Sequence, residues 1–259
     1  MNSSPLYRMV TLPRRTDSRG SMTYLEKPAQ IPFEIESVEW QAVVPGWPRK
    51  SSVNHSQLLI SIKGTVRVHL NAGNCIFQAV LSSPEQGIIF EPGIQYQLES
   101  DAPGVVLVLG SSGDTHTKQR INVEGWCDVS DHAVRTGENE NWAWRLEAST
   151  FPIKRVYYLY HLTLGATRGG HAHKMLEGLM IAPCGRFNVQ LSNESRTQTF
   201  VLDRPETVLY IPKLTWRELN NFSEDAVCLV LANGVYAEDE MIRNPDLYIQ
   251  CLKKNGENQ

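Results

Sequence analysis

The sequence predicts an all-β protein built from two tandem β-barrels. Short runs of β-branched and aromatic residues alternate with Gly, Pro, Asn and Ser along most of the 259 residues, as is typical of antiparallel barrels and sandwiches. These runs form two similar series, roughly 120 residues apart, which indicates a duplication. A hydrophobic content of 41% with 20% charged residues is sufficient to bury the cores of two such domains.

Five strands are expected in each series, in the same order. We expect them at Ser37–Val44, Leu58–Ile62, Thr65–Leu70, Gly87–Phe90 and Val105–Leu109, and again at Arg155–Leu162, Gly178–Ala182, Phe187–Leu191, Thr207–Ile211 and Ala226–Leu231. Closing so many short strands into barrels would remove unpaired sheet edges.

Alignment of the two series sets the expected domain boundaries. Phe33–Val38 aligns with Phe151–Val156, and Leu58–Gly64 aligns with Leu179–Gly185. We therefore expect a first barrel over residues 1–112 and a second over 141–259. Residues 113–140, rich in Gly, Ser, Asp, Asn and Thr, are the expected linker. The one expected helix covers Tyr236–Leu247, and Pro245 weakens that prediction.

Composition excludes several classes of function. The formal net charge is −3 and no cluster of Lys and Arg occurs, so we expect no nucleic-acid partner. The N-terminal residues contain no apolar segment and the longest apolar runs have strand length, which predicts neither a signal peptide nor a membrane span. Five widely spaced cysteines without a C-x-x-C pair favour neither a disulfide framework nor a zinc knuckle. We expect a cytoplasmic protein.

The densest polar cluster is Arg168-Gly-Gly-His-Ala-His-Lys174. Residues two apart in a strand point to the same face, so His171 and His173 are expected to project together. In a barrel interior they would place two imidazoles, with ordinary pKa values near 6.5, in one pocket suited to moving protons. The alternative is a pair of exposed histidines on an edge strand.

At these residues the second repeat resembles the sugar 3,4-ketoisomerase family, WxcM-like cupins that act on dTDP-4-keto-6-deoxyglucose. The matching segments are Phe151–Tyr158, Arg168–Lys174, Tyr210–Pro212 with Trp216, Asn221–Ser223 with Ala226–Ala232, and Tyr236–Arg243. The first repeat resembles the family chiefly in Asp17-Ser-Arg-Gly-Ser21 and Ile31–Ile35. The resemblance implies two jelly-roll (cupin) barrels.

The resemblance also implies an isomerase that transfers protons through an enediol and needs no metal or other cofactor. It implies His173 as the base at carbon and His171 as its partner, with the two roles interchangeable. Further roles in positioning the sugar, binding the diphosphate, lining the pocket or orienting a histidine are implied for Tyr158, Arg168, Arg155, Lys174, Arg217, Trp216 and Glu177. The implied partner is a dTDP-linked nucleotide sugar, in deoxysugar biosynthesis for lipopolysaccharide or O-antigen.

Metal binding is a second hypothesis for the same cluster. His171, His173 and Glu177 have the H-x-H-x-x-x-E spacing of metal-dependent cupins. Those proteins usually supply a later histidine, and this chain has Arg217 there, which offers no lone pair. Three ligands are enough for an open site, so the alternative stays open. A catalytically silent, sugar-binding bicupin is the other alternative.

The first repeat departs from the motif at its centre. Counting back from the aligned glycines places Lys50 and Ser52 where the second repeat has His171 and His173, which predicts one active site per chain. In single-barrel members the Asp-x-Arg-Gly segment crosses to the partner subunit. Here it would place Arg19 beside the histidines of the second barrel, in a homodimer or a monomeric pseudo-dimer. The alternative is a turn confined to the first barrel.

Overall fold

The computed structural model describes residues 7–26, 29–72, 75–111, 127–130, 133–135, 142–146 and 151–256. Contacts divide the chain into two compact units. The first unit contains Met1–Arg14, Thr23–Ile121 and His132–Pro152, and the second contains Arg15–Met22, Asn122–Asp131 and Ile153–Gln259. Part of the opening segment of each repeat therefore belongs to the unit built mainly from the other repeat.

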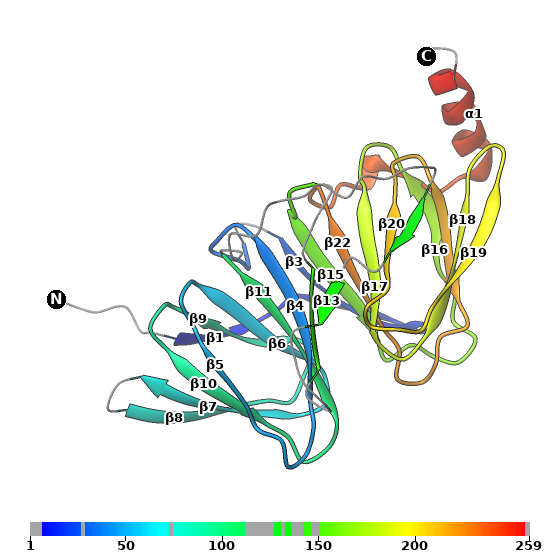
Figure 1. The fold of residues 1–259 in the computed structure, drawn as a ribbon. Helices are drawn as coiled ribbons and strands as arrows, with labels where there is room; N and C mark the ends of the chain where they lie inside the picture. The colour runs from blue at the N-terminus through cyan, green and yellow to red at the C-terminus, as the bar shows by residue number, and fades with distance from the viewer. Residues whose placement is uncertain are drawn as a thin grey trace. The chain divides into compact units, whose positions relative to one another are not determined.

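Two antiparallel sheets make up the first unit. The larger has seven strands in the order β1-β9-β6-β11-β4-β14-β13, and the smaller has four in the order β5-β10-β7-β8 (Figure 1). The strands are β1 (Tyr7–Thr11), β9 (Gln86–Phe90), β6 (Gln57–Lys63), β11 (Gly104–Gly110), β4 (Ser37–Val43), β14 (Ala143–Leu146), β13 (Ala133–Arg135), β5 (Arg49–Ser52), β10 (Gln95–Glu99), β7 (Val66–Ala72) and β8 (Cys75–Leu81).

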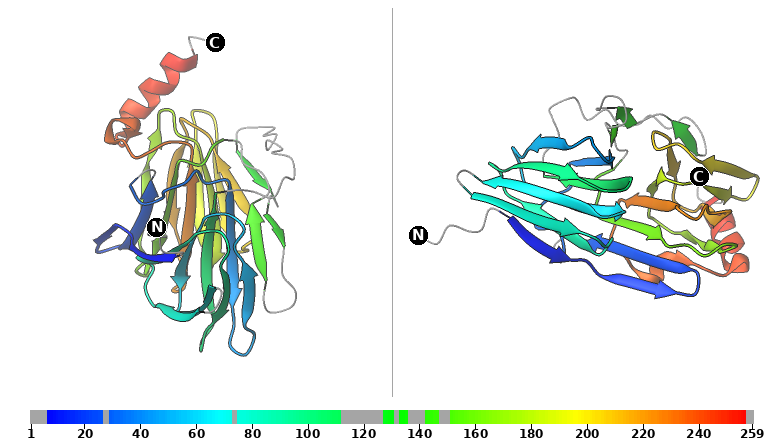
Figure 2. Two further views of the ribbon diagram at one scale, coloured as in Figure 1. Left: turned by 90° about the vertical axis from the view of Figure 1, so that its left-hand side faces the viewer. Right: turned by 90° about the horizontal axis from the view of Figure 1, so that it is seen from below.

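The second unit also has two sheets. One has seven strands in the order β12-β20-β17-β22-β15-β3-β2, and the other has five in the order β19-β18-β21-β16-β23 (Figures 1 and 2). The strands are β12 (Asp128–Ser130), β20 (Val208–Ile211), β17 (Gly178–Cys184), β22 (Val227–Ala232), β15 (Arg155–Tyr160), β3 (Gly20–Glu26), β2 (Arg14–Asp17), β19 (Thr197–Leu202), β18 (Phe187–Ser192), β21 (Trp216–Asn220), β16 (Arg168–His173) and β23 (Met241–Ile242).

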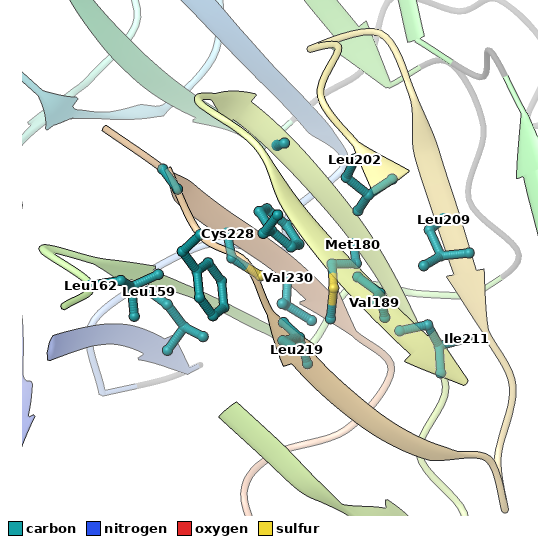
Figure 3. Packing of buried hydrophobic residues seen from close by; sticks show 14 of the residues in the cluster. Leu159, Leu162, Met180, Val189, Leu202, Leu209, Ile211, Leu219, Cys228 and Val230 are labelled. Atoms are coloured by element: carbon teal, nitrogen blue, oxygen red, sulfur yellow. The ribbon is translucent and has the colours of Figure 1, made fainter. Parts of the chain in front are cut away.

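An apolar core lies inside each unit. In β18 the buried residues Phe187, Val189 and Leu191 alternate with half-buried ones, because successive side chains of a strand point to opposite faces. They pack against Met180 and Leu209 from the other sheet (Figure 3). The core of the first unit is built in the same way from Val, Leu and Ile with stacked Phe90 and Tyr96.

The all-β prediction is confirmed, and all ten expected strand segments coincide with strands. Within the expected linker, the described residues form β12 and β13. The rest of residues 113–140 lies outside the described part of the chain, and so do residues 141, 147–150 and 257–259 of the second predicted barrel. The tandem-barrel boundaries stay a prediction, while the contact units assign residues 15–22 and 132–152 differently.

The helix prediction was wrong in position. Only a short 3-10 turn, η1 (Glu238–Glu240), lies within Tyr236–Leu247 before Pro245, and α1 runs over Pro245–Gly256 instead. Proline lacks an N–H and is tolerated in the first helical turn, so Pro245 begins the helix that it was expected to interrupt. Asn244 Oδ1 accepts the Leu247 N–H at 3.0 Å and caps the start. Within the described residues, no helix is long and apolar enough to cross a membrane.

Candidate active site

A cavity of about 310 Å³ opens in the second unit. Its wall comes from β2, β3, β15, β16, β17, β21, β22 and β23 and from the chain around Tyr236 and Arg243. Cations dominate the lining, which contains the six arginines Arg15, Arg19, Arg155, Arg168, Arg217 and Arg243 and the single carboxylate of Asp17. Such a cavity is suited to an anionic ligand.

The alternation of strand side chains supplies both the polar wall and an apolar one. On β15, Arg155, Tyr157 and Leu159 line the cavity, and on β22 Cys228 and Val230 do so. Residues i and i+2 of a strand share a face, which explains why every second residue contributes. Polar groups beside apolar surface are the usual composition of a small-molecule site.

The two histidines of β16 both line this cavity. Their ring centroids are 4.9 Å apart with an interplanar angle of 80°, an edge-to-face contact. His173 is buried, with 6% of its surface exposed. The pairing of β16 with β21 shifts register between Gly169 and His171, and this bulge directs the imidazoles to the interior. The same-face prediction is confirmed, and the edge-strand alternative is wrong.

Both imidazoles are held in the neutral form. Burial, together with the positive charge of Arg217, lowers the pKa of His171 to about 4. Burial also lowers the pKa of His173 to about 2, with Arg217 and His171 as additional causes. A neutral imidazole has a free lone pair and can accept a proton. Burial likewise lowers the pKa of Arg217 to about 10, so that Arg217 remains a cation near neutral pH.

Acidification is expected to destabilise the protein through these histidines. The unfolded chain takes up protons near the ordinary histidine pKa of about 6.5, whereas the folded chain does so only near pH 4 and below. The unfolded state binds more protons in this window, so the free energy of unfolding falls as the pH falls, by up to about 1.4 kcal/mol per pH unit for each histidine. Urea unfolding across this window measures the slope. The slope should flatten in His171→Asn, and an unchanged slope would contradict the assignment.

Several buried polar atoms of the cavity have no hydrogen-bond partner among the described residues. They are Nε and Nη2 of Arg168, Nδ1 of His171, Nδ1 of His173 and Nε of Arg217. Buried donors and acceptors are normally satisfied, because leaving one unpaired costs about 1–3 kcal/mol. All four residues line the cavity, where a polar ligand or water can complete these hydrogen bonds.

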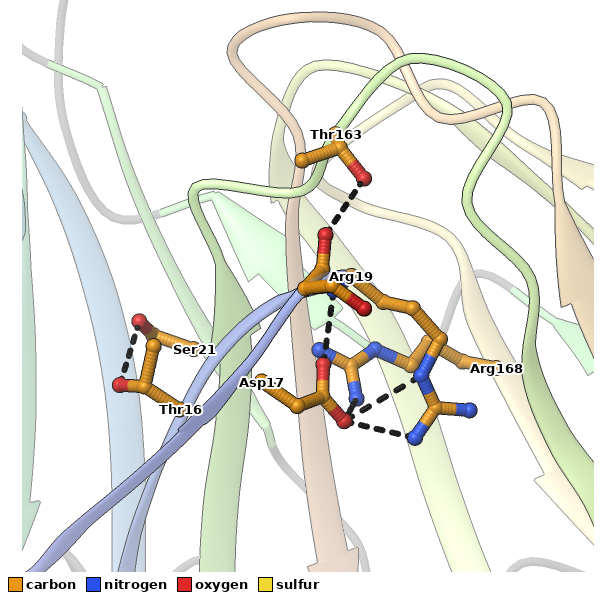
Figure 4. Close-up of polar contacts among 7 residues, drawn as sticks. Thr16, Asp17, Arg19, Ser21, Thr163 and Arg168 are labelled. Atoms are coloured by element: carbon orange, nitrogen blue, oxygen red, sulfur yellow. Dashed lines mark hydrogen bonds and ion pairs between the residues drawn. The ribbon is translucent and has the colours of Figure 1, made fainter.

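Residues 15–22 of the first repeat form part of the cavity wall. Arg168 Nη1 donates to Asp17 Oδ2 at 3.0 Å, and Thr163 Oγ1 donates to the Ser18 carbonyl at 3.3 Å (Figure 4). Gly20 has φ +129°, and a Cβ there would lie 2.8 Å from the carbonyl oxygen of His161, so glycine is required for this close approach. The expected contact of this segment with the histidine pocket is therefore present, and the turn confined to the first barrel is wrong.

The structure brings six of the ten predicted site residues into the cavity wall. These six are Arg19, Arg155, Arg168, His171, His173 and Arg217. The other four, Tyr158, Lys174, Glu177 and Trp216, lie elsewhere in the second unit. The roles of the six stay predictions, and the placement of the four is a correction.

Tyr157, and not Tyr158, lines the cavity. Tyr158 is fully buried on the opposite face of β15, where its ring lies 5.8 Å from that of Tyr160. The Arg155 guanidinium lies 4.8 Å from the centroid of the Tyr157 ring. Burial raises the pKa of Tyr157, against the opposing effects of Arg217 and Arg155, so its hydroxyl stays protonated near neutral pH. Sequence reasoning selected the neighbouring Tyr158 and missed Tyr157.

Lys174 is exposed and donates to the backbone carbonyl of Asp239. Trp216 packs against Tyr248 of α1, with ring centroids 5.4 Å apart, and its Nε1 donates to Glu218 at 3.0 Å. Both side chains therefore contact the C-terminal segment and not the cavity. Trp216 precedes the lining residue Arg217 in β21, and Lys174 follows the lining residue His173, so each points away from the face that its neighbour shares with the cavity.

Glu177 is also absent from the lining and hydrogen-bonds to Tyr210 instead. Its backbone N–H donates to Asn233 Oδ1 at 3.1 Å. The H-x-H-x-x-x-E spacing therefore does not bring this carboxylate to the two histidines. Within the described ranges, no group of three or more His, Cys, Asp and Glu side chains is arranged to hold a metal ion.

Sequence reasoning missed two further cavity residues near the C-terminus. The guanidinium groups of Arg15 and Arg155 lie 5.2 Å and 5.0 Å from the centroid of the Tyr236 ring. Arg243 Nε donates to Glu238 at 3.0 Å. Both residues fall inside segment 236–243, whose resemblance to the family could have identified them. The helix expected there gave no reason to place their side chains in the cavity.

In the first unit the residues that match the histidines differ from those found by counting. Ser51 of β5 lies opposite Tyr96 of β10 and takes the place of the first histidine. Val53, buried in the apolar core, takes the place of the second. Lys50 and Ser52, the predicted counterparts, are exposed on the other face.

Strand pairing, and not the number of residues, gives this correspondence. His171 lies opposite Arg217 of β21, and Ser51 lies opposite Tyr96 of β10. Arg217 and Tyr96 are each the buried second residue of their strands. The stretch from the histidine position to the aligned glycine is therefore one residue shorter in the first repeat.

Comparison with known proteins gives the family. The family model described as "FdtA: WxcM-like, C-terminal" matches residues 6–118 and 136–253. A curated protein of Aneurinibacillus thermoaerophilus, TDP-4-oxo-6-deoxy-alpha-D-glucose-3,4-oxoisomerase, is 34% identical over 134 residues, which are 52% of this chain and 91% of that protein.

Two solved structures of sugar 3,4-ketoisomerases are also similar. QdtA from Thermoanaerobacterium thermosaccharolyticum, in complex with TDP, is 33% identical, with a TM-score of 0.48 over 50% of this chain and 96% of QdtA. The TDP-quinovose 3,4-ketoisomerase WlaRB from Campylobacter jejuni is 35% identical, with a TM-score of 0.45 over 48% of this chain and 97% of WlaRB. Since the family model covers most of both repeats, the predicted membership is confirmed, and the chain belongs to the FdtA (WxcM-like, C-terminal) family.

Proposed function

We propose that this protein is a nucleotide-sugar 3,4-ketoisomerase that acts on a TDP-linked 4-keto-6-deoxyhexose in the cavity of the second unit. The observation that carries the proposal is the convergence of unpartnered buried donors of Arg168 and Arg217 on two neutral imidazoles. Support comes from the relatives, because the curated 34% identical protein is named for this reaction.

The reaction exchanges a ketone and the neighbouring hydroxyl. A base removes the proton on C3, the C–H electrons form a C3–C4 double bond, and the carbonyl electrons move onto O4. A proton passes from O3 to O4 across the enediol, the double-bond electrons take up a proton at C4, and the new ketone forms at C3. The chemistry needs a base, a proton shuttle and donors to the developing enediolate oxygen.

In this scheme His173 is the base at carbon, His171 is its partner, and one active site serves each chain. The low pKa values make the imidazoles weak bases, so the enediolate must be stabilised as it forms. Arg217, which is buried and whose positive charge acts on both imidazoles, is suited to that task, because preorganised charge in a dry site is strongly stabilising. Arg155 and Arg243, the remaining arginines that the second repeat contributes to the wall, suit the diphosphate.

The decisive experiment is incubation with TDP-4-keto-6-deoxyglucose in deuterated water, followed by NMR of the product, with and without a chelator. Deuterium on the sugar ring of a 3-keto product supports proton transfer through an enediol. Product without solvent deuterium would overturn the mechanism, and dependence on one added metal ion would favour the metal-dependent alternative. Binding without turnover would favour a sugar-binding bicupin.

Tyr157→Phe is expected to lower kcat/KM by roughly tenfold, because it removes one hydroxyl hydrogen bond to the bound sugar or enediolate. Tyr158→Phe is the matched control on the same strand and should leave kcat/KM within about twofold of the wild type. Steady-state kinetics on both variants give the comparison. A larger loss in Tyr158→Phe would contradict the placement of the active site on this face of β15.

The biological setting proposed from the family resemblance is deoxysugar biosynthesis in the cytoplasm, for lipopolysaccharide or O-antigen. The partner is the nucleotide sugar, and a homodimer and a monomeric pseudo-dimer are the two assembly states to separate. Sedimentation equilibrium of the full chain distinguishes them, since the pseudo-dimer requires the mass of one chain.

A further inference from the structure

Asp17 is the point at which the opening segment of the first repeat joins the cavity wall. Its Oδ2 accepts from Arg19 Nη2 at 2.7 Å, from Arg19 Nε at 3.2 Å and from Arg168 Nη1 at 3.0 Å. Its Oδ1 accepts the backbone N–H of Arg19 at 2.8 Å. Figure 4 shows the carboxylate between the two guanidinium groups.

The Asp17 carboxylate remains ionised throughout the pH range in which the enzyme would be assayed. Hydrogen bonds from Arg19, with the nearby charge of Arg168, lower the pKa of Asp17 to about 2. It is also the single acidic side chain in a described wall that holds six arginines. A fixed negative charge among several cations orders the guanidinium that it contacts, because charge-assisted hydrogen bonds are short and directional.

Arg168 differs from Arg19 in exposure. The Arg168 side chain is 12% exposed, whereas that of Arg19 is 52% exposed. Asp17 occupies only Nη1 of Arg168, while its Nε and Nη2 are buried without a partner among the described residues. The bond to Asp17 therefore fixes one corner of the guanidinium and leaves two donors available within a wall that also holds His171 and His173.

We propose that Asp17 is a positioning residue, contributed by the first repeat, that holds Arg168 so that its Nε and Nη2 donate to the bound substrate. The proposal rests on the proposed function. It makes this carboxylate, and not the Arg19 guanidinium, the group through which the first repeat serves the reaction. Arg19 clamps Asp17 through three hydrogen bonds, so its effect on substrate is indirect.

Asp17→Asn tests the idea, because the amide keeps the size of the side chain and removes its charge. We expect kcat/KM to fall about tenfold or more, since a misdirected donor costs orientation in the transition state, with little change in Tm. In an Arg168→Lys background the same substitution should cost less than about twofold, because residues that act through one another are non-additive. Arg19→Lys should have an intermediate effect.

Asp101→Asn is the matched control. In the first unit Asp101 pairs with Arg67 through two hydrogen bonds, the longer of them 2.7 Å, at an exposed site. Because Asp101 is not among the residues that line the cavity, Asp101→Asn should change neither kcat nor KM. A second readout does not depend on turnover, namely the side-chain 15Nε NMR signal of Arg168, assigned with Arg168→Lys. Asp17→Asn should shift and broaden it, and Asp101→Asn should not.

The outcomes separate this proposal from the proposed function. If the wild type fails to isomerise the ketosugar, the function falls, while an Arg168 signal that changes with Asp17→Asn still supports the positioning contact. Equal effects of Asp17→Asn in the wild-type and Arg168→Lys backgrounds would overturn the positioning role. So would an unchanged Arg168 signal, or a larger loss in Arg19→Lys than in Asp17→Asn, which would mean that Arg19 contacts substrate directly.

Discussion

Replacing either His171 or His173 by asparagine is expected to lower kcat by roughly 10²-fold or more, the scale of lost acid–base catalysis. Asparagine keeps polarity but has no lone pair of imidazole basicity, so the C3 proton has no acceptor. The rings are in edge contact, 4.9 Å apart, and belong to one catalytic unit. The double variant should therefore lose little more than the more damaging single variant.

His69→Asn provides the control for this experiment. His69 pairs with Glu99 at 3.1 Å in the first unit, so the same substitution there should leave kcat unchanged. Rapid-quench kinetics measure the rate of turnover, and NMR detection of solvent deuterium in the product measures proton transfer to carbon. Full retention of kcat in His173→Asn, with the fold intact by circular dichroism, would remove this residue from the mechanism.

Gly169→Ala is expected to lower kcat/KM by about tenfold or more and to reduce the free energy of unfolding by on the order of 1–3 kcal/mol, the cost of a side chain forced into a left-handed conformation. Gly169 has φ +83°, and a Cβ there would lie 2.4 Å from the carbonyl oxygen of Arg217. Neither backbone can yield without moving β16 from β21. That movement would displace the imidazoles from the Arg217 guanidinium.

Gly170→Ala isolates the role of this clash. Gly170 also has a positive φ, +67°, but a Cβ added to it would meet no atom within 4 Å, so the substitution carries only the backbone strain. Chemical denaturation with parallel kinetics should show the larger loss in Gly169→Ala on both measures. Equal losses in the two variants would show that strain alone, and not the contact with Arg217, explains the requirement for glycine.

Sequence reasoning succeeded where a regular period applies. The alternation of apolar residues located ten strands, and the spacing of His171 and His173 placed both on one interior face. It failed where the two repeats differ in length. Strand pairing makes Ser51 and Val53 the first-repeat counterparts of the histidines, because the stretch that follows them is one residue shorter in the first repeat.

The remaining misses have local causes. Tyr157 and Tyr158 are adjacent and chemically identical, but they lie on opposite faces of β15. Only Tyr157 is on the face that lines the cavity, and the sequence does not show which face that is. Pro245 was read as a helix breaker although it begins a helix. The ion pair between Asp17 and Arg168 joins residues 151 positions apart, and no local pattern encodes such a contact.

The exchange of opening segments has a consequence for the order in which the chain is completed on the ribosome. The seven-stranded sheet of the first unit contains β14, whose Trp144 pairs with Trp40 of β4. This sheet cannot close until the second repeat has begun to emerge. The second unit in turn uses residues 15–22, which are translated before the whole of the second repeat. Cutting the gene between the repeats would thus yield two fragments that each lack a strand, and the long sequence separation of these pairings favours slow, mutually dependent folding.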